Sequence, residues 1–123
     1  MTGAELKTIR ESLNLSAKEL ADRLGVASDR TIRRWESAEG RPVPVGVAGA
    51  VRIWDAAVDE AVARSIPDST GHPFNHAICL ARHEQGPFPG DALPHSRRLH
   101  HAYLARLRRL LEARGVVVTI EYQ

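Results

Sequence analysis

The chain has 123 residues, of which 43% are hydrophobic and 26% charged, and its formal net charge is +2 at pH 7. This length suits one domain with a small appendage, and the hydrophobic content excludes a wholly disordered chain. No stretch approaches the roughly 18 consecutive apolar residues of a membrane span, and the first residues lack the basic start and apolar run of a secretion signal. A single cysteine, Cys79, excludes an internal disulfide, so we expect a cytoplasmic protein.

Two short helices are predicted at the N-terminus, each preceded by a capping box of the form Ser/Thr-x-x-Glu. The capping boxes are Thr2 to Glu5 and Ser16 to Glu19. Hydrophobic residues at helical spacing extend the first helix over about residues 3–14. The second helix ends at Gly25, a residue type that favours helix C-termini.

A third helix is predicted from about residue 28 to residue 38, with Ile32 and Trp35 turned inward. Its opposite side carries three arginines. Two short helices joined by a tight turn, the second with a basic exposed side, are typical of a helix-turn-helix, whose second helix lies in the DNA major groove.

The exposed side of this third helix holds the candidate base contacts. Arginine matches the O6 and N7 acceptors of guanine with two hydrogen bonds, which favours Arg30 and Arg33 for base recognition. Asp29 can accept a hydrogen bond from cytosine or cap its own helix, and a solvated helix face is the alternative for the arginines. The predicted base-contacting residues are Ser28, Asp29, Arg30 and Arg33.

Phosphate contacts are predicted around the start of the second helix, because helix N-termini bind anions. The candidate residues are Thr2, Lys7, Ala17, Lys18, Thr31, Arg34 and Arg41. Three further residues are expected to be structural. Arg10 and Glu36 would pair and tie the first helix to the end of the third, and Trp35 would lie in the core.

The rest of the chain predicts a long helix and a small mixed segment. Pro44 suits the first turn of a helix that reaches about Arg64, with an inward face at a spacing of three or four residues. That face is formed by Val47, Val51, Trp54, Val58 and Val62. The stretch from Pro67 to Pro73 is a break in composition.

Beyond this break the pattern predicts a strand within residues 75–83, a loop at 86–90, a helix from Pro94 to Arg114 and a strand at 116–122. The expected fold is therefore α+β and mostly α, with an N-terminal bundle of about four helices and a small C-terminal strand-helix-strand segment that dimerises. The predicted domains are residues 1–65 for DNA binding, 66–74 as a linker, and 75–123 for dimerisation or interaction.

The C-terminal helix is predicted to be amphipathic. Its buried face would hold Leu99, Tyr103, Leu107, Leu110 and Leu111, and its basic side Arg97, Arg98, His101, Arg108 and Arg109. The basic side is either a solvated surface or a phosphate contact on DNA or RNA. His100 falls among the leucines and is expected to be a core or interface histidine.

The sequence shows no pattern typical of a metal site or of an enzyme active site. The six histidines and the one cysteine do not have the spacing of a zinc site, so we expect no metal. Nothing resembles a nucleophile with its base, a phosphate-binding loop or a pair of catalytic carboxylates. We therefore expect no catalytic residues, no cofactor and no enzymatic activity.

The N-terminal residues resemble the Cro/repressor-type (XRE-like) helix-turn-helix family over about residues 4–55. The matching residues are Leu6, Arg10, Ser16, Leu20, Ala21, Leu24, Gly25, Val26, Ile32, Trp35 and Glu36. Two features depart from the family pattern. Ala17 stands where a DNA-contacting glutamine is frequent, and the segment from Gly25 to Glu36 is one residue longer than usual. More loosely, the chain resembles the subgroup that contains anti-CRISPR-associated autorepressors. That likeness implies a dimer formed by the C-terminal part and an inverted repeat near the protein's own promoter.

These observations predict a transcriptional regulator that binds double-stranded DNA, acts as a homodimer on a palindromic operator and represses. Two alternatives remain open. One is an antitoxin-like module that binds a protein partner through its C-terminal segment, and the other is an RNA-binding regulator that uses the basic C-terminal helix.

Overall fold

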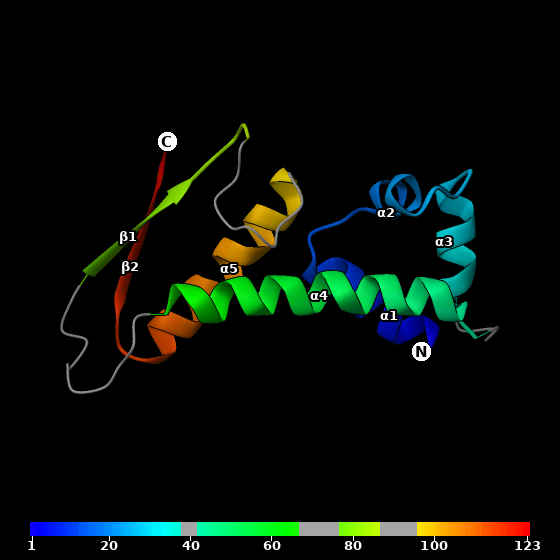
Figure 1. The fold of residues 1–123 in the computed structure, drawn as a ribbon, viewed down its shortest axis with the longest axis horizontal. Coiled ribbons are helices and arrows are strands. Elements are labelled where there is room, and N and C mark those ends of the chain that lie inside the picture. The colour runs from blue at the N-terminus through cyan, green and yellow to red at the C-terminus, as the bar shows by residue number, and fades with distance from the viewer. Residues whose placement is uncertain (38–41, 67–76, 87–95) are drawn as a thin grey trace. The chain divides into compact units, whose positions relative to one another are not determined.

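A computed structural model describes residues 1–37, 42–66, 77–86 and 96–123 (Figure 1). The described elements are α1 (Gly3–Ser12), α2 (Ala17–Leu24), α3 (Asp29–Glu36), α4 (Val45–Ser65), β1 (Ala77–Arg82), α5 (Arg97–Ala113) and β2 (Val117–Tyr122). The predicted fold class, mostly α with a small strand part, is confirmed. None of the described helices is long and apolar enough to cross a membrane.

The chain divides into two compact units, Met1–Ala56 and Ala57–Gln123, so the division falls within α4. The predicted linker at residues 66–74 lies outside the described residues except for Ile66. A linker there stays a prediction.

Capping explains where the first two helices begin. The Thr2 side chain accepts a hydrogen bond from the Glu5 N–H at 3.1 Å. Ser16 accepts one from the Glu19 N–H at 3.1 Å, and the Glu19 carboxylate accepts one from the Ser16 N–H at 3.3 Å. Both predicted capping positions therefore satisfy backbone donors that a helix start leaves free.

The helix ends differ from the predicted ones by one or two residues. α1 ends at Ser12 rather than near residue 14, because Asn14 has a φ of 61° and so leaves the right-handed helical region. α2 ends at Leu24, and its C-cap residue Gly25 has a φ of 71°, which suits glycine. α3 ends at Glu36, since Ser37 is extended. Ser28 occupies the capping position of α3 but its side chain makes no capping hydrogen bond.

The core of the first unit is formed by large aliphatic residues from every helix. Leu6, Leu13, Leu20, Ile32 and Val51 are all fully buried. Both tryptophans, Trp35 and Trp54, are only half-buried, which differs from the inward positions expected for them. The Arg23 guanidinium lies 5.3 Å from the Trp54 ring centroid and accounts for part of this ring's cover.

α4 begins one residue later than predicted. Pro44 precedes the helix, and its carbonyl accepts the first helical hydrogen bond, from the Ala48 N–H at 3.0 Å. Pro44 therefore stands at the capping position and not within the first turn. The predicted inward residues Val51, Val58 and Val62 are buried, and Val47 is half-buried.

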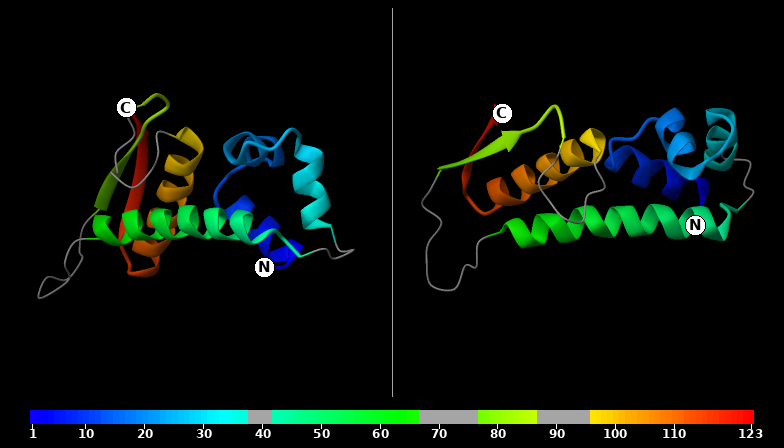
Figure 2. Two further views of the ribbon diagram at one scale, coloured as in Figure 1. Left: turned by 45° about the vertical axis from the view of Figure 1, so that its right-hand side comes forward. Right: turned by 45° about the horizontal axis from the view of Figure 1, so that its top comes forward.

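The two described strands of the second unit pair within the chain and in parallel (Figure 2). The register runs from Ala77 opposite Val117 to Arg82 opposite Tyr122. A parallel pair needs a crossover connection, and α5 provides the described helical part of it. The predicted start of this helix at Pro94 lies outside the described residues.

The packing of α5 corrects one predicted core position. Leu107 and Leu111 pack with Val62 and Val116 in a buried cluster. Leu110, which was expected in the buried face, is 36% exposed, while Leu104 is buried. Leu104 lies three and seven residues before Leu107 and Leu111 on the same helical stripe, whereas Leu110 lies at the edge of that stripe.

Candidate nucleic-acid interface

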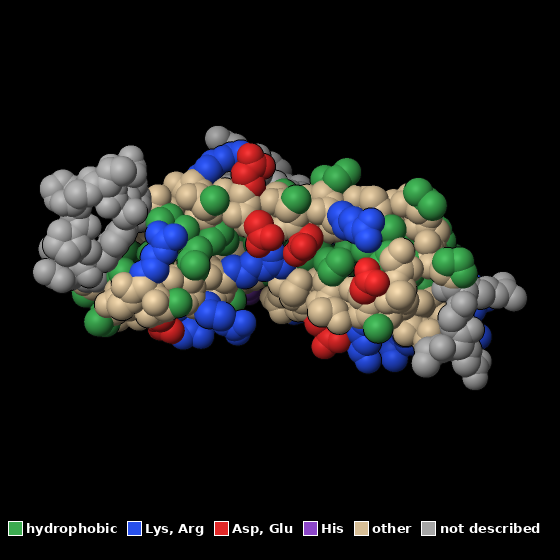
Figure 3. All heavy atoms as spheres, turned by 90° about the horizontal axis from the view of Figure 1, so that it is seen from below, with side chains coloured by type: hydrophobic (Ala, Val, Ile, Leu, Met, Phe, Trp, Pro, Cys, Tyr) green, Lys and Arg blue, Asp and Glu red, His purple; other side chains and the backbone are tan. Residues whose placement is uncertain are grey.

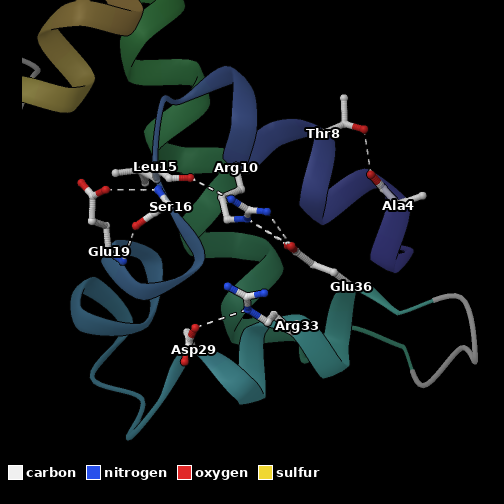
Figure 4. Close-up of polar contacts among 9 residues, drawn as sticks. All are labelled: Ala4, Thr8, Arg10, Leu15, Ser16, Glu19, Asp29, Arg33 and Glu36. Atoms are coloured by element: carbon white, nitrogen blue, oxygen red, sulfur yellow. Dashed lines mark hydrogen bonds and ion pairs between the residues drawn. The ribbon is translucent and has the colours of Figure 1, made fainter.

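An ion pair between Arg10 and Glu36 connects the first and third helices (Figure 4). Arg10 donates to both carboxylate oxygens of Glu36, with Nε–Oε2 and Nη2–Oε1 distances of 2.9 Å. Its remaining Nη1 donates to the Leu15 carbonyl at 2.9 Å. The two side chains are 13% and 6% exposed, and the hydrogen bonds that Arg10 donates to Glu36 raise the pKa of Arg10. One guanidinium thus fixes α1, the α1–α2 turn and the end of α3 to one another.

A close backbone contact lies at the start of α1. A Cβ atom at Gly3 would lie 2.4 Å from the Trp35 carbonyl oxygen and 2.9 Å from the Glu36 carbonyl carbon. Only glycine therefore lets α1 begin against the end of α3. Sequence reasoning did not identify this residue, although a glycine directly after a helix cap, where it costs helix stability, is the available signal.

The predicted base-contacting side chains lie on the outer side of α3. Arg30, Arg33 and Arg34 are exposed, as is Ser28. The Arg33 Nε lies 3.3 Å from Asp29 Oδ2, with the two side chains 73% and 41% exposed. An exposed pair one helical turn apart contributes little to stability, so Arg33 can exchange this carboxylate for another acceptor at small cost.

An open groove of about 500 Å³ brings part of the predicted phosphate-contacting set together. It is lined by Lys7, Arg10, Ser16, Ala17, Arg33, Glu36 and Ser37. The Ala17 side chain is buried, so this residue can offer the groove only its backbone N–H. Lysine, arginine and the N-terminus of α2 on one groove suit an anion.

The other predicted phosphate contacts do not line this groove. Lys18 and Arg34 are exposed elsewhere on α2 and α3, Thr31 is half-buried, and Arg41 lies outside the described residues. The Thr2 hydroxyl caps α1 and also donates to the Glu5 carboxylate at 3.2 Å. Thr2 therefore already has a structural role.

The basic side of α5 is partly neutralised by local acids. Arg97, Arg98, Arg108 and Arg109 are exposed. Within the described residues, Arg108 pairs with Glu112 at 3.1 Å, and Arg97 lies 3.9 Å from Glu84. Figure 3 shows one face, on which acidic and basic side chains are both visible. The printed ion pairs reduce the net positive charge on this side of α5.

His101 does not belong to this basic side. Its side chain is 14% exposed, its Nδ1 lies 3.3 Å from Nη2 of Arg82, and burial lowers its pKa. His101 contacts Arg82 at the end of β1, and His100 contacts His83, the residue that follows β1. The His100 Nε2 accepts a hydrogen bond from the His83 N–H at 3.2 Å, and burial lowers the pKa of His100 to about 4. His100 is therefore a core histidine, as expected.

Comparison with known proteins agrees with the geometry of the first unit. Residues 6–43 match the family described as Helix-turn-helix. This segment is a helix-turn-helix of the Cro/repressor (XRE-like) type. A helix-turn-helix is a DNA-binding motif, with α2 and α3 here as its two helices.

Two curated relatives match the chain over short stretches. Over 41 residues it is 51% identical to the type II methyltransferase M.SsoII of Shigella sonnei. This stretch covers 32% of this chain and 11% of that protein. Over 58 residues it is 41% identical to the type II methyltransferase M1.ScrFI of Lactococcus lactis subsp. cremoris. This stretch covers 42% of this chain and 15% of that protein. The chain thus spans only a small part of the length of either relative.

Proposed function

We propose that this protein is a sequence-specific transcriptional regulator, a homodimeric repressor that binds an inverted-repeat operator through α3 in the major groove. The observation that carries the proposal is the outer side of α3. It presents Arg30 and Arg33 to solvent, while Ile32 is fully buried. This arrangement lets the arginines reach guanine edges without disturbing the core.

The groove beside α3 supports the same orientation on DNA. With α3 in the major groove, Lys7 and the N-terminus of α2 would meet the phosphate backbone next to it. Phosphate contacts position the protein, and the α3 arginines would then select the sequence. Arg10 and Glu36 line the same groove but neutralise each other, so we assign them a structural role.

A homodimer would present two copies of α3 to the operator. The half-sites of such an operator lie about 34 Å, or one helical turn, apart. A two-fold dimer sees the same surface twice, so the operator would be an imperfect palindrome. Blocking of polymerase at the protein's own promoter is the simplest form of repression, and a promoter-reporter assay that showed activation would contradict it.

Selection of bound duplexes from a random DNA library tests the proposal. The purified full chain is used at a stated salt concentration, because phosphate contacts make affinity strongly salt-dependent. We expect a palindromic motif with two half-sites. Enrichment of no motif, with only salt-sensitive binding to any nucleic acid, would overturn sequence-specific regulation.

The exposed arginines of α5 favour a second candidate, an RNA-binding regulator. A hairpin RNA and a duplex DNA are compared for the wild type and for a variant with Arg97, Arg98, Arg108 and Arg109 changed to alanine. Loss of RNA binding with unchanged DNA binding would support this candidate. Equal DNA binding and no RNA binding by both proteins would reject it.

A further inference from the structure

β2 forms one edge of the sheet and carries exposed hydrophobic residues of the second unit. In the part of the chain that the structure describes, the sheet has two strands. On β2, Val117 is 65% exposed, Ile120 38% and Tyr122 77%. A two-stranded sheet depends on packing against a helix or on further strands for its stability, and an exposed hydrophobic edge strand is a template for another strand.

The backbone of β2 shows which groups face this edge. The Gln123 N–H donates to the Arg82 carbonyl at 3.1 Å, so Gln123 faces β1. The backbone groups of residues along a strand point alternately to its two sides. Those of Val118, Ile120 and Tyr122 therefore point away from β1, toward the open edge.

The side chains of these three residues lie on the face of the sheet that α5 covers. Val118 packs against the buried cluster around Leu107 and Leu111. Ile120 and Tyr122 follow at intervals of two residues, so they project to the same face. They remain exposed nonetheless, which leaves hydrophobic area on this face to be covered.

We propose that β2 pairs with β2 of a second copy of this chain, antiparallel and centred on Ile120, to give a four-stranded sheet. This inference deepens the homodimer in the proposed function and rests on it. A two-fold axis through the sheet keeps both α5 helices on one face. The exposed Ile120 and Tyr122 of both copies would then lie together on that face, where the second copy covers them.

The sequence of β2 is complementary to itself in this register. Ile120 lies opposite the partner's Ile120, and Val118 lies opposite the partner's Tyr122, a β-branched and aromatic pair that stabilises sheets. Thr119 lies opposite the partner's Glu121. A centre on Glu121 would instead set two carboxylates directly opposite each other, which is unfavourable.

Charges placed on the two-fold axis test the pairing and its register. Ile120→Lys and Ile120→Glu each place like charges opposite one another, whereas a mixture of the two variants places opposite charges there. By sedimentation velocity of the full chain, we expect the wild type to be a dimer. Each variant alone should be a monomer, because its dimer dissociation constant should rise at least 100-fold. The mixture of the two variants should again be a dimer. The matched controls are Val45→Lys and Val45→Glu. Val45 is 89% exposed in the first unit, so both controls should remain dimers.

Disulfide cross-linking is a second measurement, and it does not require the charged variants to fold. Ile120→Cys in a Cys79→Ser background should oxidise to a disulfide-linked dimer, because Cα atoms of directly opposed residues lie about 5.5 Å apart, within disulfide range. Val45→Cys in the same background should not. A wild-type monomer, dimeric Ile120→Lys protein, or no cross-link at residue 120 would each overturn this interface.

Operator selection separates this inference from the proposed function. A palindromic motif together with a dimer that Ile120→Lys leaves intact would overturn the β2 interface and keep the regulator. A dimer that Ile120→Lys dissociates, with no selected motif, would overturn the regulator and keep the interface.

Discussion

Arg33 takes part in an intrahelical ion pair and is also a candidate for base recognition. Its Nε lies 3.3 Å from Asp29 Oδ2, and both side chains are well exposed. On DNA, the guanidinium would exchange a weak surface pair for two hydrogen bonds to guanine. Asp29 would then be free to accept a hydrogen bond from a neighbouring cytosine.

We expect Arg33→Ala to weaken specific DNA binding by about 1–3 kcal/mol and to relax the preference at one base pair. Affinities for the selected operator and for single-base variants of it measure both effects. Arg52→Ala, at an exposed arginine on α4, is the control and should change neither. An equal loss of affinity for every sequence would instead make Arg33 a phosphate contact.

The Arg10–Glu36 pair gives a second prediction for single residues. Glu36→Gln leaves the Arg10 charge without its carboxylate at a site where only 13% of the side chain is exposed. We expect the free energy of unfolding to fall by about 3–5 kcal/mol. Urea denaturation followed by tryptophan fluorescence measures it.

Replacing both partners with hydrophobic residues removes the stranded charge. Arg10→Met combined with Glu36→Leu should therefore be more stable than Glu36→Gln alone. Equal stability of Glu36→Gln and the wild type would mean that the pair does not hold the helices together.

Among the helices, the contact at Gly3 reverses the usual effect of alanine. Within a helix, Gly→Ala ordinarily stabilises by about 0.5–1 kcal/mol. At Gly3 the new Cβ would lie 2.4 Å from the Trp35 carbonyl oxygen. We expect Gly3→Ala to destabilise by about 1–3 kcal/mol, because α1 must move away from α3.

Gly46→Ala is the matched control, since a Cβ at this α4 position would meet no atom within 4 Å beyond its chain neighbours and the adjacent backbone of its own helix. It should raise the melting temperature, whereas Gly3→Ala should lower it. A melting temperature raised by both substitutions would refute the close approach of α1 to α3.

Local signals predicted the helices of the first unit well. The capping boxes and Gly25 act through neighbouring residues only, so the starts of α1 and α2 follow from the sequence. The end of α1 does not, because the left-handed Asn14 depends on how the chain turns toward α2. The partial exposure of Trp35 likewise depends on the shape of the packed helices, which spacing along one helix does not contain.

The candidate interface was predicted in its residue types more than in its geometry. Spacing on α3 indicated an exposed arginine side, and the opposite charges of Arg10 and Glu36 indicated a pair between the first and third helices. The groove that joins Lys7, Ala17 and Arg33 depends on three helices and could not be derived from any one of them. Arg41 lies outside the described residues and stays a prediction.

At the scale of the whole molecule, the two units should differ in their response to acid. His100 is 1% exposed and lies near His83, His101, Arg82 and Glu84. Burial and the neighbouring positive charges lower its pKa from 6.5 to about 4 in the folded state. Between these values the unfolded chain binds more protons than the folded chain, so stability falls as the pH drops from about 6.5 toward 4.

We expect the second unit to lose on the order of 1 kcal/mol of stability per pH unit in this window. Both tyrosines lie in the second unit and both tryptophans in the first. Tyrosine absorbance and tryptophan fluorescence therefore report the two units separately during denaturation at pH 7 and pH 5. His100→Gln, which keeps an acceptor for the His83 N–H but does not titrate, should reduce the pH dependence. An unchanged dependence would assign it to other groups.

The sense of the β1–β2 pair was not predictable. The β-branched residues of β2 indicate a strand, but nothing in either strand alone distinguishes parallel from antiparallel pairing. The choice depends on how α5 returns the chain to the sheet. The first unit differs in degree, because its helices are capped by neighbouring residues and its Arg10–Glu36 contact spans 26 residues, fewer than separate Ala77 from Val117.

The parallel pair has a consequence for the order of folding during synthesis. Ala77 pairs with Val117, so β1 cannot find its partner until the whole of α5 and then β2 have left the ribosome. The helices of the first unit need no such distant segment, and local contacts form faster than distant ones. The first unit should therefore be folded before β1 has its partner strand, and during that interval β1 is exposed to mispairing with other chains.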